Sequence, residues 1–117
     1  MRRFIAIFSS NLPHIFLIAQ RLSPRIELCP PDGLLLEVTA RSERKTLKTF
    51  LEQAEDPLKT GIASTRITAI LAAHTRSGTV VPDGKERDFL ASWPVERLFL
   101  ILQEADSKLL STLFQWG

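Results

Sequence analysis

Short apolar runs of strand length alternate along this chain with longer segments in which apolar residues recur at helical spacing. The short runs predict strands over residues 4–8, 25–28, 34–39, 60–63 and 79–81. The longer segments predict helices over residues 14–22, 42–56, 64–76 and 95–116, with a further helix that begins after Asp83. The predicted order is strand, helix, two strands, helix, strand, helix, a short strand and further helix.

Capping and turn residues place several boundaries of these elements. Ser42 is a residue type that caps helices, and we expect it to begin the second helix. Asp83, followed three residues later by Glu86, is similar to a capping box and predicts the start of the fourth helix. Asp32 and Gly33 follow two prolines and predict a tight turn that joins the second and third strands in a hairpin.

This order of elements is that of the split βαβ, ferredoxin-like arrangement. It predicts an α+β sandwich of βαββαβ type, in which an antiparallel sheet is covered by helices on one face, with a C-terminal helical extension. The length of 117 residues suffices for one domain with a substantial core. Because the composition changes near Trp93 and Pro94, we expect a main domain over residues 1–93 and a small helical element over 94–117.

Composition excludes several classes of protein. Hydrophobic residues make up 44% of the chain and charged residues 24%, which predicts a folded protein and not a disordered tail. The net charge of +2 permits nucleic-acid binding but does not argue for it. The single Cys29 excludes an intrachain disulfide and a cysteine zinc site. The apolar run at residues 4–8 is too short for an export signal or a membrane span, so we expect a cytoplasmic protein.

Three stretches of the chain resemble parts of a known polymerase family. Residues 23–27 read Ser-Pro-Arg-Ile-Glu, residues 31–39 read Pro-Asp-Gly-Leu-Leu-Leu-Glu-Val-Thr, and residues 61–66 read Gly-Ile-Ala-Ser-Thr-Arg. The first two resemble the hairpin, and the third the strand-to-helix turn, in the palm of Y-family translesion DNA polymerases. The likeness is greatest to the ImuB-type branch, which commonly lacks catalytic residues.

The second half of the chain extends this resemblance. Residues 79–82 and 89–98 resemble the link from the palm into the thumb, so the likeness covers residues 23–98 in the family's order. It implies a palm-like domain over residues 1–93 and the start of a thumb over 94–117. The chain runs from its first helix directly into the hairpin, where the family inserts a fingers subdomain.

The chain departs from active family members at the positions that carry their chemistry. The stretch that aligns with the first-strand aspartate contains Ser9, Ser10 and Asn11, and Gly33 stands where a glutamate follows the second aspartate. The lysine that touches triphosphate in the third helix is also missing, and Arg66 matches only an earlier basic position. Two-metal phosphoryl transfer needs several carboxylates around one pair of ions. The resemblance therefore implies a protein without nucleotidyltransferase activity, catalytic residues or a cofactor.

The sequence leaves two interpretations of Asp32 open. It is either the remnant of the family's metal site, with weak affinity for a divalent ion, or a turn residue selected for its backbone geometry. His14 and His74 are too far apart in sequence to form a local metal motif, and Cys29 is expected to be a small core residue.

The resemblance implies an accessory of DNA repair or translesion synthesis that acts through DNA and protein contacts. The alternative is a ferredoxin-like module for protein interaction or ligand sensing, with no role on DNA. Candidate phosphate contacts are the basic residues Arg41, Arg44, Lys45, Lys48 and Arg66, although basic residues interleaved with acidic ones are also typical of a solvated face. The apolar tail offers Leu110, Phe114 and Trp116 as candidates for a protein or homodimer contact.

Overall fold

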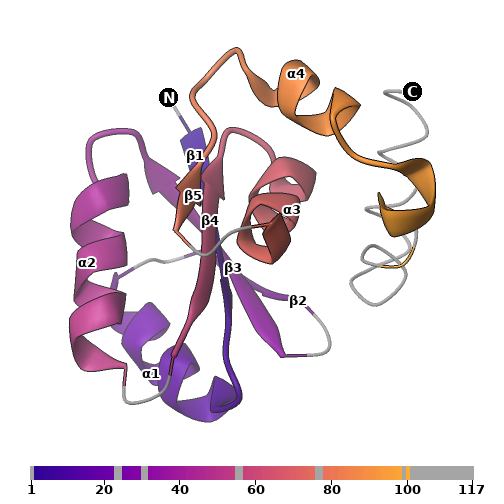
Figure 1. Cartoon of the computed structure of the whole chain (residues 1–117). Coiled ribbons are helices and arrows are strands. Elements are labelled where there is room, and N and C mark those ends of the chain that lie inside the picture. The colour runs from indigo at the N-terminus through magenta and orange to yellow at the C-terminus, as the bar shows by residue number, and fades with distance from the viewer. Residues whose placement is uncertain are drawn as a thin grey trace.

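The computed structural model of the chain describes residues 2–22, 25–29, 32–54, 57–75, 78–98 and 100. This part of the chain is an α+β domain, in agreement with the fold class that the sequence predicts (Figure 1). Its elements are, in order, β1 (Arg2–Phe8), α1 (Leu12–Leu22), β2 (Ile26–Cys29), β3 (Gly33–Thr39), α2 (Glu43–Gln53), β4 (Lys59–Ala63), α3 (Arg66–Thr75), β5 (Thr79–Val80) and α4 (Glu86–Ala91).

The five strands form one sheet in the order β2-β3-β1-β4-β5. β1 lies in the middle and pairs antiparallel with β3 from Arg2 opposite Thr39 to Phe8 opposite Gly33. β1 also pairs antiparallel with β4, and β2 pairs antiparallel with β3. β5 joins β4 in parallel, so the prediction of a purely antiparallel sheet was wrong at this one pair. The reason is that α3 is a crossover helix, which returns the chain to the end of the sheet where β4 began.

Helices cover both faces of the sheet, and the prediction of a single covered face was wrong. Along β1, Ile5 and Ile7 pack with residues of α1 and α2, whereas Phe4, Ala6 and Phe8 pack with residues of α3. Successive side chains of a strand point to opposite faces, so α3 lies across the sheet from α1 and α2 (Figure 1). The physical reason is that β1 is apolar at both sets of alternating positions.

α3 lies close against β4 because both elements carry small residues where they meet. Ala69, Ala72 and Ala73 of the helix are fully or almost fully buried. A Cβ atom added to Gly61 of β4 would lie 2.4 Å from the carbonyl oxygen of Ala69 and 2.4 Å from the backbone nitrogen of Ala73. The glycine is therefore needed for close approach of two backbones, not for an unusual φ angle.

The start of α4 differs from the predicted capping box. The helix begins at Glu86, two residues later than a cap at Asp83 would place it, and Lys85 holds the N-cap position. Gly84 adopts a φ of 84°, which turns the chain before the helix. The Asp83 carboxylate accepts a hydrogen bond from the Ser64 hydroxyl instead, and Glu86 accepts one from the Gly84 N–H. Both carboxylates are thus used in tertiary and turn contacts.

The chain continues from α4 to the predicted C-terminal extension, of which only the beginning is described. Leu98 is buried and packs with Ile67 and Leu71 of α3. Residue 99 and residues 101–117 lie outside the described residues, as do the interface candidates Leu110, Phe114 and Trp116. The thumb-like element over residues 94–117 and the domain boundary before it remain predictions. In the described part of the chain, no helix has the length and apolar character needed to cross a membrane.

Replacing Gly61 with alanine tests the close contact between α3 and β4. We expect Gly61→Ala to lower the free energy of unfolding by about 3 kcal/mol, because two backbones have to separate to admit the methyl group. Gly78→Ala is the matched control, since its Cβ meets nothing within 4 Å and only its φ of 83° opposes the change. It should cost about 1–2 kcal/mol. Urea unfolding measures both, and an equal or smaller loss at Gly61 would contradict the packing argument.

Candidate functional site

The Asp32 turn lies beside the end of the central strand. The Ser9 N–H donates a hydrogen bond of 3.1 Å to the backbone carbonyl of Asp32, and Phe8 is paired with Gly33. Asp32 itself is exposed. The fold therefore brings the turn next to Ser9 and Ser10, which stand at the positions where the polymerase resemblance would place a first-strand carboxylate.

The groups around this turn serve the backbone. The buried Ser9 hydroxyl accepts a hydrogen bond of 3.0 Å from the Asn11 N–H at the entry to α1. A side chain at position 33 would meet the Phe8 ring, because a Cβ on Gly33 would lie 2.5 Å from it. Among the described residues, no three His, Cys, Asp or Glu side chains form a group that could hold a metal ion. Asp32 is thus a single carboxylate, and the groups described beside its turn are hydroxyl and backbone groups.

Glu37, the other carboxylate of the hairpin, lies at the far end of β3. It is paired with Phe4, whereas the Asp32 turn meets β1 at Phe8. Its carboxylate accepts hydrogen bonds from Arg2 at 3.2 Å and Arg25 at 3.4 Å. The length of the strand therefore separates the two carboxylates, and they cannot share one ion.

A buried arginine underlies the strand-to-helix turn at residues 61–66. The Arg3 side chain is 4% exposed. Its guanidinium donates hydrogen bonds to the Glu43 carboxylate at 2.8 Å, to the Ser64 hydroxyl at 2.5 Å and to the Val81 carbonyl at 2.7 Å. One cation from β1 thus connects the start of α2, the turn before α3 and the residue after β5. Sequence reasoning missed this residue, and the only signal was a charge directly before a buried strand.

Carboxylates already occupy the hydrogen-bond donors of this turn. The Ser64 N–H donates to Glu86 at 3.0 Å, and the Ser64 hydroxyl donates to Asp83 at 3.0 Å. Glu86 also lies 3.8 Å from the Arg3 guanidinium. An external anion could bind here only by displacing these side chains, so the turn acts as a joint between α3 and α4.

Arg66 takes part in a local charge network on the α3 face of the sheet. Its guanidinium donates hydrogen bonds of 2.9–3.1 Å to both carboxylate oxygens of Glu27 and lies 5.0 Å from the centroid of the Phe4 ring. The hydrogen-bonded Glu27 carboxylate raises the pKa of Arg66 above its ordinary value. The positive charge of Arg66, which the sequence suggested for phosphate contact, is therefore neutralised by Glu27 within the protein.

This network borders a shallow groove of about 260 Å³ beside α3. Its lining combines apolar side chains with a balanced set of charges: Phe4, Arg25, Ile26, Glu27, Leu35, Glu37 and Arg66. The groove lies near the Phe4 end of β1, so it is distinct from the Asp32 turn at Phe8. Two arginines and two glutamates give it no excess of either charge.

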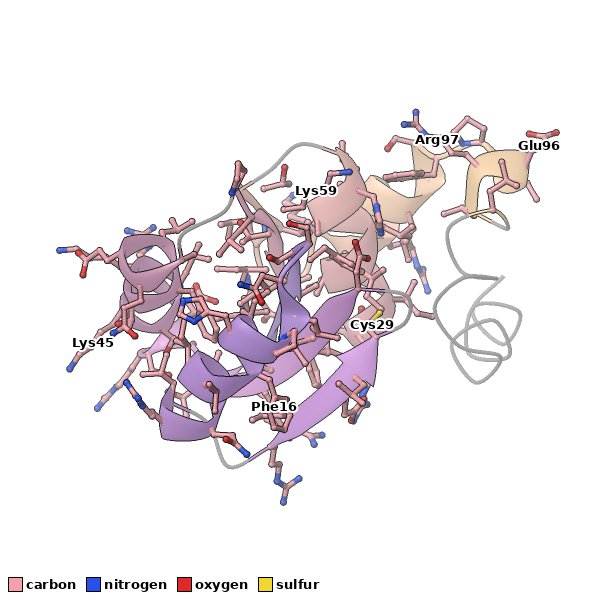
Figure 2. The ribbon with its side chains drawn as sticks, turned by 90° about the horizontal axis from the view of Figure 1, so that it is seen from below. Phe16, Cys29, Lys45, Lys59, Glu96 and Arg97 are labelled. Atoms are coloured by element: carbon pink, nitrogen blue, oxygen red, sulfur yellow. The ribbon has the colours of Figure 1, made fainter. Side chains whose placement is uncertain are left out.

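The remaining basic candidates form one surface. Arg44, Lys45 and Lys48 are exposed on α2, and Arg41 is exposed in the turn before it. Within the helix, Lys48 follows Arg44 by four residues and Lys45 by three, a spacing typical of one helix face, and Arg41 precedes them in the turn. Figure 2 shows Lys45 projecting from α2 away from the sheet. We call these four residues the α2 basic stripe.

The fold makes the stripe more uniformly basic than the sequence suggests. Glu43, which interrupts the stripe in sequence, points inward and binds the buried Arg3. Within the described residues, the only ion pair on the stripe joins Lys48 to Glu52 at 3.8 Å, and both side chains are more than half exposed. Arg66 is not part of it, because α3 lies on the opposite face of the sheet. The five predicted contacts thus divide into four that lie together and one that is separate.

The two histidines also lie on opposite faces. His14 of α1 places its Nε2 atom 3.1 Å from the carbonyl oxygen of Gln53, which connects the start of α1 to the end of α2. The His74 ring of α3 packs on Phe8, with 4.6 Å between ring centroids. Cys29 is buried in the cluster on the α3 face, as the sequence predicts for a small core residue. These positions give the histidines packing and connecting roles.

Replacing Arg3 with methionine tests the buried network. We expect Arg3→Met to lower the free energy of unfolding by about 3–5 kcal/mol, since it leaves Glu43 and Glu86 without their cation. Arg2→Met removes an arginine that is 74% exposed and should cost less than about 1 kcal/mol. Thermal and urea unfolding compare the two. Similar losses for both variants would show that burial of the charge does not matter.

Comparisons of this chain with protein-family models, with curated proteins and with solved structures found no match.

Proposed function

We propose that this chain is a non-catalytic, Y-family-like protein of the ImuB type, which assists DNA repair or translesion synthesis through contacts with DNA and with other proteins. The observation that carries the proposal is the position of the Asp32 turn beside the end of β1. An active palm would need further carboxylates there, and Ser9 and Ser10 take the neighbouring positions.

The strand order supports the proposed ancestry. The first four strands follow the order β2-β3-β1-β4 with antiparallel neighbours, and α1 and α2 connect them in a β-α-β-β-α-β sequence. This connectivity supports a ferredoxin-like split βαβ arrangement. We therefore propose a ferredoxin-like palm whose fingers insertion is missing. Fold alone does not establish function, so the proposal depends on the site and on the motifs that resemble the family.

The α2 basic stripe is the surface that we assign to DNA. Phosphate contacts by lysine and arginine release counterions, so binding through them weakens as salt increases. The stripe has three exposed cations on α2 and a fourth, Arg41, in the turn before it, with a single acidic partner among the described residues. Contacts to phosphates carry no sequence information, and we expect the stripe to bind without sequence preference.

Charge reversal on the stripe tests the DNA contact. We expect the full chain to bind primer-template DNA at low salt, and Arg44→Glu combined with Lys45→Glu to weaken binding at least about tenfold and to lower the salt slope by about 2. The control is Lys85→Glu with Arg87→Glu, which changes the net charge equally at exposed residues near α4. Fluorescence anisotropy across a salt series measures both.

Two results would oppose the DNA contact. Absence of binding by the wild-type chain at low salt removes it. Equal weakening by both double variants would mean that net charge, and not the α2 basic stripe, governs binding.

Primer extension tests the claim that the site is not catalytic. With Mg²⁺ or Mn²⁺, we expect no nucleotide incorporation by the wild-type chain, because one carboxylate cannot hold two metal ions. We also expect Asp32→Ala to leave DNA binding and stability nearly unchanged, since the side chain is exposed and only the backbone carbonyl is bonded to β1. Incorporation by the wild type that disappears in Asp32→Ala would overturn this part of the proposal.

A second candidate function is an interaction module with no role on DNA. One observation favours it: the edge strand β2 carries Leu28, which is 66% exposed. This candidate predicts a protein partner at the sheet edge and no dependence on the α2 basic stripe.

A further inference from the structure

β2 is an edge strand whose outer side meets no other strand of the described chain. The Glu37 N–H donates a hydrogen bond of 3.3 Å to the Arg25 carbonyl, which places the backbone groups of residue 25 on the inner side, toward β3. In an antiparallel pair this orientation alternates along the strand. The N–H and carbonyl groups of Ile26 and Leu28 therefore point outward, where they offer a template for another strand.

One face of this edge is apolar. Ile26 and Leu28 are paired with Leu36 and Leu34, which pack on the α1 and α2 side of the sheet. Leu28 is 66% exposed, and Ile26 is only partly buried. Phe16 of α1 is also partly buried in the same cluster and is labelled in Figure 2. A strand added at this edge would cover apolar surface that the described chain leaves in solvent.

The other face of the edge carries charges of both signs. Arg25 and Glu27 lie on the α3 side, one position either side of Ile26. Arg25 is 73% exposed on its side chain and Glu27 is 54% exposed. A positive and a negative charge placed symmetrically about one residue form a self-complementary pattern for a strand that meets a copy of itself in the antiparallel direction.

We propose that β2 pairs antiparallel with β2 of a second copy of this chain, so that the two sheets join into one. The two-fold axis passes beside Ile26, which lies opposite the partner's Ile26. Arg25 then lies opposite the partner's Glu27, and Glu27 opposite the partner's Arg25. Each Glu27 keeps its bond to Arg66, so a row of alternating charges crosses the junction.

This register is favoured over the next possible one. Residues opposite each other in an antiparallel pair lie on the same face of the sheet. The two-fold axis of the dimer can therefore pass beside one residue or beside the next one along β2, but not between them. An axis beside Glu27 would place two glutamates opposite each other, which is destabilising. An axis beside Ile26 places opposite charges together at two positions and like charges at none.

The dimer that this edge supports is weak and reversible. β2 has four residues, so the pairing contributes few backbone hydrogen bonds and a small buried area. The exposed ion pairs mainly select the register and the partner. The α2 basic stripe belongs to a helix distant from this edge in Figure 1, so dimerisation and DNA binding are tested separately.

Sedimentation velocity over a wide concentration range tests the dimer in the full-length chain. We expect reversible dimerisation by the wild type, and a loss of affinity of at least roughly tenfold for Arg25→Glu and for Glu27→Arg, since each puts like charges across the axis. An equimolar mixture of the two variants should recover dimers, because every cross-axis pair is then of opposite charge. This recovery separates an effect on the interface from an effect on folding.

Two further variants locate the contact. Ile26→Pro removes an outward N–H that the described sheet does not use, and it should abolish the dimer while the circular dichroism spectrum stays native. Leu51→Ser changes an exposed leucine on α2 and should leave the dimer intact. A wild-type chain that stays monomeric, a mixture that fails to recover dimers, or a dimer lost in Leu110→Glu but kept in Arg25→Glu would overturn the proposal.

Discussion

The buried guanidinium of Arg3 is the interaction on which the arrangement of this domain depends. A charge that is 4% exposed is costly unless it is paired and hydrogen-bonded. Its partners come from the start of α2, the turn before α3 and the residue after β5, and Glu86 of α4 lies near them. Segments far apart in sequence must therefore meet at the beginning of the central strand β1. This requirement fixes how α2 and α4 join the sheet.

The same pairing shapes the surface of the protein. Because Glu43 turns inward to Arg3, the outer face of α2 keeps its cations and loses an acidic neighbour. On the other side of the sheet, Arg66 and Glu27 neutralise each other over Phe4, and the groove beside α3 has balanced charge. The distribution of carboxylates, more than the positions of the basic residues, thus decides which surface is positive.

The helices cover the sheet unequally, and this explains where the groove and the exposed sheet edge lie. α3 packs on β1 and β4, where Gly61 and the alanines of the helix allow a close approach. On that face, Cys29 at the end of β2 is buried in the cluster with α3, whereas charged side chains border the groove beside the start of β2. At the opposite end of β1, the Asp32 turn holds a single carboxylate beside hydroxyl groups. The open edge at β2 and the single carboxylate at the Asp32 turn are consequences of separate features of the fold.

The sequence by itself determined the type and order of the elements, because apolar period and turn residues act over a few neighbouring positions. The runs at 4–8 and 34–39, the turn at Asp32 and the buried Cys29 were predicted correctly in this way. It did not reveal that β5 would join in parallel, that α3 would cover the second face, or that Asp83 would bond Ser64 and not cap α4.

Those outcomes depend on contacts between residues many positions apart, which local patterns do not specify. The candidate site shows the same division. The basic residues near α2 were visible in the sequence, but only the tertiary structure decided that four of them are exposed on α2 and the turn before it, while Arg66 is paired with Glu27. Arg3 and Glu27 gave almost no signal in the sequence. The importance of Arg3 comes from its burial and from a partner 40 positions away, and that of Glu27 comes from a partner 39 positions away. Both contacts exist only once the chain has folded.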